Sequence, residues 1–437
     1  MTSRRHFLAQ SLTALALPTG LARASDPRLA DPGIIRATPR DQTVLRLGGL
    51  GDGYKMTLRP DGTQLVVVND GPGWADPPTA FYNTRLWTVD GAPQNARFAV
   101  TPHYPDLNRT ARPPEAPRYY GHGVIQLGEH IYQFVATHDN AAERPQRWSG
   151  AKLIWSADDG RTWRNRDGTT PVVWEDWPQQ SRDSFTFFNE ADGAFSLLSI
   201  LQPMRGHPAA PDGWLYIYGL NGSTDGLMNQ LLLFRVRPEA ITQRSAYRFF
   251  AGHDAQGRAV WSADIARRRP VHRFPAGWVN YTNLFPGDLV VESWLPSVIY
   301  NAPLGCYMMA SAGIGVASDG TEFGRPSYFG LWIAPNPWGP WRQIHEDAAW
   351  CPGGDREARA YAPQIAPGWI ADDGCSFWLV WSDLKGIREF GRDEKLLEAA
   401  LAAAEGLAEK ALVETQFLRR YMPGFSFNAQ RVDLVLR

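Results

Sequence analysis

The chain has 437 residues, and its 44 lysines and arginines against 45 aspartates and glutamates give a net charge of −1. Basic residues form no stripe and do not interleave with aromatic residues, which excludes the usual footprint of a nucleic-acid or anionic-membrane binder. We therefore expect no nucleic acid partner. The 18 tryptophans and 15 tyrosines suit the stacking of sugar rings, although we expect most of them to fill gaps in the core.

Residues 1–24 have the features of a twin-arginine (Tat) signal peptide. Ser3-Arg4-Arg5-His6-Phe7-Leu8 is followed by an apolar stretch at 8–21 and by the small-residue cleavage pattern Ala22-Arg23-Ala24. An uncleaved anchor is the alternative, but the stretch is shorter than the roughly 20 residues that span a bilayer. We expect a mature chain from Ser25, exported to the periplasm or beyond, with no membrane span.

Five apolar strands recur along the chain, each entered by a short turn and ended by polar residues. Their spacing of roughly 65 to 90 residues suits the four-stranded blades of a propeller. Each has an apolar partner just upstream, joined by a Gly or Asp-Gly turn that is typical of hairpins. The pattern predicts an all-β fold, a five-bladed β-propeller over residues 25–437. The five strands lie at 61–70, 127–139, 212–222, 304–313 and 373–383. The upstream partners lie at 51–60, 119–127, within 187–204, at 292–301 and at 361–370.

Third strands are expected at 151–156, 230–236 and 328–334. The segment Ser156 to Trp163 then resembles the Asp-box of sialidases, Ser-x-Asp-x-Gly-x-Thr-Trp, at every fixed position. Its composition suits a tight turn, in which Asp158 caps backbone N–H groups and Gly160 takes a positive φ. A turn between strands three and four lies on the face opposite the start of the inner strands, so we predict no catalytic role for its aspartates.

From 394 to 421, apolar residues follow the i, i+3, i+4 rule of a helix, with Glu and Lys between them. This helical insertion precedes a last strand at 427–436. We expect it to pack against the propeller, and a lid or a partner surface is the alternative. The three cysteines allow one disulfide, but free thiols are the favoured state, and no Cys-x-x-Cys or His-x-x-x-His spacing indicates a metal. We therefore expect no cofactor.

Propeller geometry selects the candidate site. Residues at the start of strand one and the end of strand two surround the axial pocket, where propeller ligands usually bind. Carboxylates with aromatic residues between them are the equipment for acid and base chemistry on a sugar. The candidates for the reacting carboxylates are Asp52, Asp70 and Glu292. The candidates for substrate binding are Trp74, Tyr120, His122, Asp139, Glu190, Asn221, Tyr361 and Asp383.

Each candidate has a structural alternative. Asp52 is flanked by glycines that leave its carboxylate uncovered, and Asp70 is near Trp74, a candidate stacking platform, yet both aspartates could simply cap turns. His122 lies between two glycines that permit close approach of a ligand, or it is a core histidine beside the channel.

The chain as a whole resembles a family of bacterial five-bladed propellers related in fold to the arabinanases, some members of which are endo-D-arabinanases. The likeness spans roughly 45–437 and is carried by the Asp52 segment, the strand ending at Asp70, Glu292 with Ser297-Val298 and Tyr300-Asn301, and Tyr361-Ala362-Pro363. The resemblance implies an exported glycoside hydrolase acting on a polysaccharide. The alternatives are a non-catalytic propeller that binds glycan or an envelope protein, and a metal- or cofactor-bearing enzyme, which only Tat export suggests.

Overall fold

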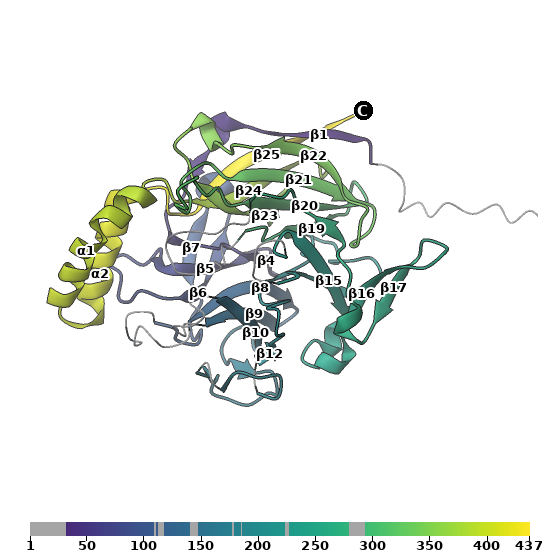
Figure 1. The fold of residues 1–437 in the computed structure, drawn as a ribbon, viewed down its shortest axis with the longest axis horizontal. Coiled ribbons are helices and arrows are strands. Elements are labelled where there is room, and N and C mark those ends of the chain that lie inside the picture. The colour runs from purple at the N-terminus through teal and green to yellow at the C-terminus, as the bar shows by residue number, and fades with distance from the viewer. Residues whose placement is uncertain are drawn as a thin grey trace, which may run out of the picture.

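A computed structural model describes residues 32–108, 111, 118–139, 147–176, 179–184, 186–222, 227–278 and 293–437. Five antiparallel sheets follow one another along the chain, which confirms the predicted five-bladed β-propeller (Figure 1). The proposed signal peptide and Glu292 lie outside the described residues.

Each blade has its innermost strand first in sequence. The first blade contains β3 (Leu50–Asp52), β4 (Met56–Leu58), β5 (Gln64–Gly73), β6 (Thr84–Asp90) and β7 (Arg97–Val100). The second contains β8 (Tyr119–Leu127), β9 (His130–Asp139), β10 (Arg147–Ser156), β11 (Arg164–Asn165) and β12 (Thr186–Phe188). The third contains β13 (Leu198–Ile200), β14 (Leu215–Leu220), β15 (Gln230–Val236), β16 (Arg248–His253), β17 (Ala259–Ser262) and β18 (His272–Arg273). The fourth contains β19 (Ser297–Asn301), β20 (Cys306–Gly313), β21 (Tyr328–Ala334) and β22 (Arg342–Asp347).

The fifth blade is built from both ends of the described chain. It contains β23 (Ala360–Ile370), β24 (Ser376–Asp383), β25 (Asn428–Leu436), β1 (Ile34–Pro39) and β2 (Leu45–Arg46). Ile34 pairs with Leu436, and the Arg40 Nε donates to Asp433 Oδ2 at 2.7 Å. β1 was not predicted, because its six residues show no alternating apolar pattern. Figure 1 shows β1 beside β25 at the outer edge of this blade.

The turns between first and second strands have the predicted chemistry. The Asp61 carboxylate accepts the N–H of Thr63 at 2.9 Å, and Gly62 has a φ of 86° that a side chain would disfavour. Asp373 and Gly374 repeat this arrangement in the fifth blade. The strands that follow are buried on both faces, because each blade is packed between two others. This explains why β20 and β21 read as unbroken apolar runs.

Tryptophans form part of the core of the propeller, and eight of those in the described residues are buried. Trp294 has no exposed surface and stacks on Phe274 with ring centroids 4.8 Å apart. Aromatic rings suit the core because one side chain buries a large area. The buried tryptophans of the described residues are Trp87, Trp148, Trp163, Trp294, Trp332, Trp350, Trp369 and Trp381.

The helical insertion is a pair of helices rather than the single predicted helix. α1 (Ile387–Ala403) starts seven residues earlier than the predicted 394, and α2 (Gly406–Tyr421) follows a break at Ala404, whose ψ of 138° is extended. Figure 1 shows both helices together at one end of the molecule, outside the blades. No helix of the described residues is long and apolar enough to cross a membrane.

One side of the helical pair is buried against the propeller. Leu418 and Ala411 of α2 pack in a cluster with Leu50, Phe81 and Leu384. Three other leucines that fit the helical period remain exposed, namely Leu396, Leu407 and Leu412.

Candidate active site

The antiparallel pairing brings the starts of all five inner strands and the ends of all five second strands to one face, which we call the entry face. Leu50 pairs with Gly73, for example, and Ala360 pairs with Asp383. Beneath this face the axial channel is nearly closed, because side chains from all five blades leave a cavity of only about 10 Å³. That volume is at the limit for one water molecule, so this cavity holds no larger ligand.

Asp52 and Tyr361 meet on the entry face across the boundary between the first and fifth blades. The Tyr361 hydroxyl donates a hydrogen bond to Asp52 Oδ2. Tyr361 is buried, its ring lies edge-on to Phe323 with centroids 5.0 Å apart, and Asp52 is half-buried. Burial and the neighbouring Asp52 charge raise the pKa of Tyr54 well above its usual value. The site therefore holds a partly accessible carboxylate in a fixed orientation.

The glycines around Asp52 are needed for close packing. A Cβ on Gly51, which has a φ of 140°, would lie 2.5 Å from the carbonyl oxygen of Asn69, and one on Gly53 would lie 2.6 Å from the Asn69 Nδ2. Asn69 in turn exchanges hydrogen bonds of 3.0 and 3.1 Å with the backbone of Gly121. This side chain joins the first blade to the second directly beneath Asp52.

Asp70 follows Asn69, which pairs with Asp52 across β3 and β5. Its φ of 47° is uncommon for a residue with a side chain, and its N–H donates to the Asn83 carbonyl at 3.2 Å. The structure thus places the two predicted aspartates on neighbouring strands. The half-buried indole of Trp74, the predicted stacking platform, donates to the Leu47 carbonyl at 2.8 Å and stacks on Phe98 of the first blade.

Backbone strain is concentrated on the entry face. Seven non-glycine residues of the described chain have a positive φ, and five of them lie at inner-strand starts or in loops of this face. Such conformations cost of order 1–3 kcal/mol each and cluster at functional sites. The five are Asp70, Phe195, Trp294, Phe323 and Ala362.

Glu322 is an acidic residue that the sequence analysis missed. It lies in the loop between β20 and β21, directly before Phe323, which contacts Tyr361 and accepts a 2.7 Å hydrogen bond from Arg359 Nε through its carbonyl. Burial raises the pKa of Glu322 to about 7, so this side chain keeps its proton in mildly acidic solution. One indication of such a residue was present in the sequence. The second strand of the fourth blade ends in Ser311-Ala312-Gly313, without an acidic residue, so an acid from this blade had to come from another segment.

The second blade contributes two buried rings. Tyr120 and His122 lie edge-on to Trp148, with centroids 5.4 and 5.9 Å away. Burial, and then the charge of Lys55, lowers the pKa of His122 to about 3, so the imidazole is neutral at ordinary pH. Neither of its ring nitrogens has a hydrogen-bond partner among the described residues. His122 therefore lies buried between the two flanking glycines.

Three predicted binding residues have structural contacts instead. Glu190 is buried and pairs with Arg244 at 2.8 Å. Asn221 accepts a hydrogen bond from Arg268 Nε at 2.9 Å. Asp383 is 1% exposed, and its Oδ1 accepts two backbone N–H groups at 2.7 and 2.9 Å. All three side chains thus form hydrogen bonds or an ion pair within the protein.

The remaining acidic candidates can be placed only in part. Asp139 is the last residue of β9, at the entry face, and the placement of its side chain is not described. The aspartates of the turn after β10 lie on the opposite face, as predicted. There Asp158 Oδ1 accepts the Thr162 N–H at 2.8 Å, and Asp159 pairs with Arg59 of the first blade at 2.5 Å.

The fold defines a five-bladed β-propeller with acidic residues on its entry face. No protein-family model and no curated protein matches the sequence. Among solved structures, the chain is similar to the catalytic domain of the Coprinopsis cinerea GH62 α-L-arabinofuranosidase, with 10% identity, 92% of this chain and 98% of that chain covered, and a TM-score of 0.38.

Two further solved structures are similar at a comparable level. The Cellvibrio cellulosa α-L-arabinanase, complexed with arabinohexaose, is 9% identical, with 78% of this chain and 88% of that chain covered and a TM-score of 0.40. The endo-arabinase from Bacteroides thetaiotaomicron is 12% identical, with 79% and 92% covered and a TM-score of 0.32. At these values the likeness is distant, so the function must follow from the residues of this chain.

Proposed function

We propose that this chain is a carbohydrate-active enzyme that hydrolyses glycosidic bonds of a polysaccharide or oligosaccharide at the entry face. The observation that carries the proposal is a pair of carboxyl groups in unlike surroundings. Asp52 accepts a hydrogen bond from the Tyr361 hydroxyl, whereas burial raises the pKa of Glu322 to about 7. One ionised and one protonated carboxyl are what glycoside hydrolysis requires.

The two groups then have distinct roles. Glu322 donates its proton to the leaving glycosidic oxygen, while Asp52 either attacks the anomeric carbon or activates a water that does so. Asp70, one residue beyond the strand partner of Asp52, is a further acidic candidate on the same face. The ring of Tyr361, packed on Phe323, connects the segments that carry the acid and the base.

The test is a screen of the chain from Ser25 onward for release of reducing ends from neutral polysaccharides. Asp52→Asn and Glu322→Gln should each lower kcat by about 10²- to 10⁴-fold, the usual contribution of an acid or base. Glu129→Gln, at an exposed glutamate in the turn between β8 and β9 on the opposite face, is the matched control and should leave kcat unchanged. Full activity of Asp52→Asn would refute the assignment. Binding of a polysaccharide without turnover in the parent protein would favour the non-catalytic alternative.

Export remains the second part of the proposal, and it is supported by Arg4-Arg5 and by the Ala22-Arg23-Ala24 cleavage pattern. Expression of the full chain in a Tat-competent bacterium should give a periplasmic or secreted protein that begins at Ser25. Replacement of both arginines by lysine should retain the protein in the cytoplasm. Export of this double variant at the parent level would contradict the Tat assignment.

A further inference from the structure

A groove of about 830 Å³ lies on the face opposite the entry face, between the first and fifth blades, and we call it the rear groove. Its walls are the turn at Asp61, the turn after Asp90 and the ends of the two inner strands of the fifth blade. β23 runs from Ala360 on the entry face, which pairs with Asp383, to Ile370 in this groove, which pairs with Phe377. The six steps of β24 between these partners, at about 3.3 Å each, give a separation of roughly 20 Å. The rear groove is therefore separate from the candidate active site.

Hydrogen bonds between blades fix the walls of the rear groove. The Trp369 indole N–H donates to the Gly91 carbonyl at 2.9 Å, from the fifth blade to the first. Arg205, which follows the inner strand of the third blade, donates to the Gly62 carbonyl at 3.1 Å. Because these hydrogen bonds hold the groove walls in place before a ligand binds, binding costs little conformational entropy of the protein.

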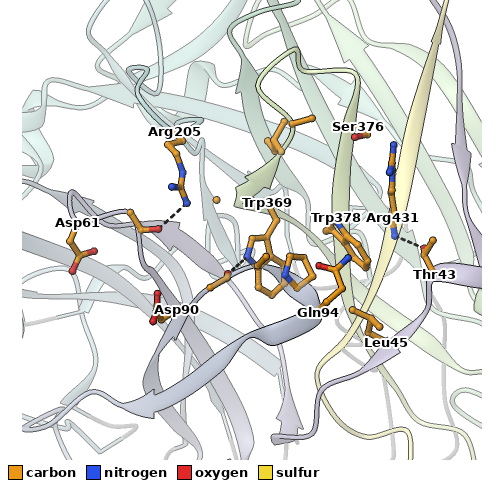
Figure 2. A pocket seen from close by; sticks show the side chains of 17 residues that line it. Thr43, Leu45, Asp61, Asp90, Gln94, Arg205, Trp369, Ser376, Trp378 and Arg431 are labelled. Atoms are coloured by element: carbon orange, nitrogen blue, oxygen red, sulfur yellow. Dashed lines mark hydrogen bonds between the residues drawn. The ribbon is translucent and has the colours of Figure 1, made fainter.

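Several polar groups in the rear groove have no partner within the described residues. The half-buried Trp378 presents an indole ring whose N–H makes no hydrogen bond, and the exposed amide of Gln94 makes none either. Asp61 and Asp90 each use only one carboxylate oxygen in the hydrogen bonds that the structure gives. Figure 2 shows Gln94 and Trp378 on one side of the groove, and Asp61 and Asp90 on the other.

The charges in the rear groove are balanced. Asp61 and Asp90 are matched by Arg205 and Arg431, so a charged polymer gains no net attraction there. Sugar hydroxyls, in contrast, can donate to the carboxylates and accept from the guanidinium and amide groups, while the apolar face of a sugar ring stacks on an indole. We propose that the rear groove binds a neutral oligosaccharide segment. It would thereby hold a polysaccharide on the face opposite the entry face, where the proposed hydrolysis takes place. This binding does not depend on turnover at Asp52.

The experiment measures affinity rather than turnover. Soluble arabinan, galactan and xylan are titrated into the Asp52→Asn protein by calorimetry, with polygalacturonate as the anionic comparison. We expect at least one neutral polymer to bind, and Trp378→Ala in this background to weaken its affinity by about tenfold or more. Gln94→Ala changes an exposed side chain, cannot disturb the core, and should weaken binding about threefold through the loss of one hydrogen bond.

Trp214→Ala is the matched control. Trp214 is also half-buried, directly before the second strand of the third blade, and contacts Arg235 and Arg237 outside the rear groove. Its replacement should leave the affinity unchanged. The inference is overturned if no neutral polymer binds, if polygalacturonate alone binds, or if Trp378→Ala and Gln94→Ala both bind as tightly as the Asp52→Asn parent. Binding that is present in the parent and lost in Asp52→Asn places the polymer on the entry face and also overturns it.

Discussion

The raised pKa of Glu322 predicts how the stability of the folded protein changes with pH, in addition to its proposed role in catalysis. Its carboxyl has a pKa of about 7 in the folded protein and of 4.5 in the unfolded chain. Between these values the folded state binds more protons, so this contribution to stability is complete below pH 4.5 and is lost as pH rises through 7. A pKa difference of about 2.5, at 1.36 kcal/mol for each pKa unit, corresponds to about 3 kcal/mol. Glu322→Gln, which cannot ionise, should be more stable than the parent at pH 8 by about that amount.

Urea unfolding followed by tryptophan fluorescence at pH 5, 6, 7 and 8 measures this effect. All other titrating groups are common to the parent and the variant, so the difference between them isolates Glu322. The exposed Glu357→Gln should follow the parent curve at every pH. If Glu322→Gln shows the same pH dependence as the parent, Glu322 is not protonated in the folded protein and cannot be the proposed acid.

Three other predictions concern single contacts. Tyr361→Phe removes the hydrogen bond to Asp52 and should lower kcat by about tenfold with KM little changed, and an unchanged kcat would show that the contact is not used. Lys152→Met removes the buried ion pair with Glu175, 3.0 Å away, and should cost about 3–5 kcal/mol in urea unfolding, most of which the added Glu175→Leu should restore. Asp383→Ala should cost about 1–3 kcal/mol without changing the activity of the folded fraction, and lost substrate affinity would instead support its predicted binding role.

The blades were predictable because their signals are local. An Asp-Gly turn such as Asp61-Gly62 and the apolar run after it lie within ten residues, and both report on the same hairpin. β13 shows the limit of this reasoning. Its inner strand is only Leu198–Ile200, and the sequence placed it no more closely than within 187–204. β1 was missed because its partner strand β25 lies almost 400 residues away.

The candidate site was less predictable because distant partners decide what each side chain does. Nothing around Trp74 in the sequence shows that Phe98 stacks on it, and nothing around Glu190 indicates Arg244, 54 residues later. Asp52 and Tyr361 were both selected from strand ends, but their contact joins residues 309 positions apart. The raised pKa of Glu322 results from burial, which a single sequence does not reveal.

The pairing of β1 with β25 has a consequence for biosynthesis. Residues 34–39 are made almost 400 residues before their partner strand, residues 428–436. Four blades can form before β25 has been made, while the fifth must wait for it, and contacts of such large sequence separation form slowly. Until then the edges of β1 and β24 are unpaired strands that can recruit other chains. A chaperone that covers these strand edges until the fifth sheet is complete would therefore have most effect at this step of folding.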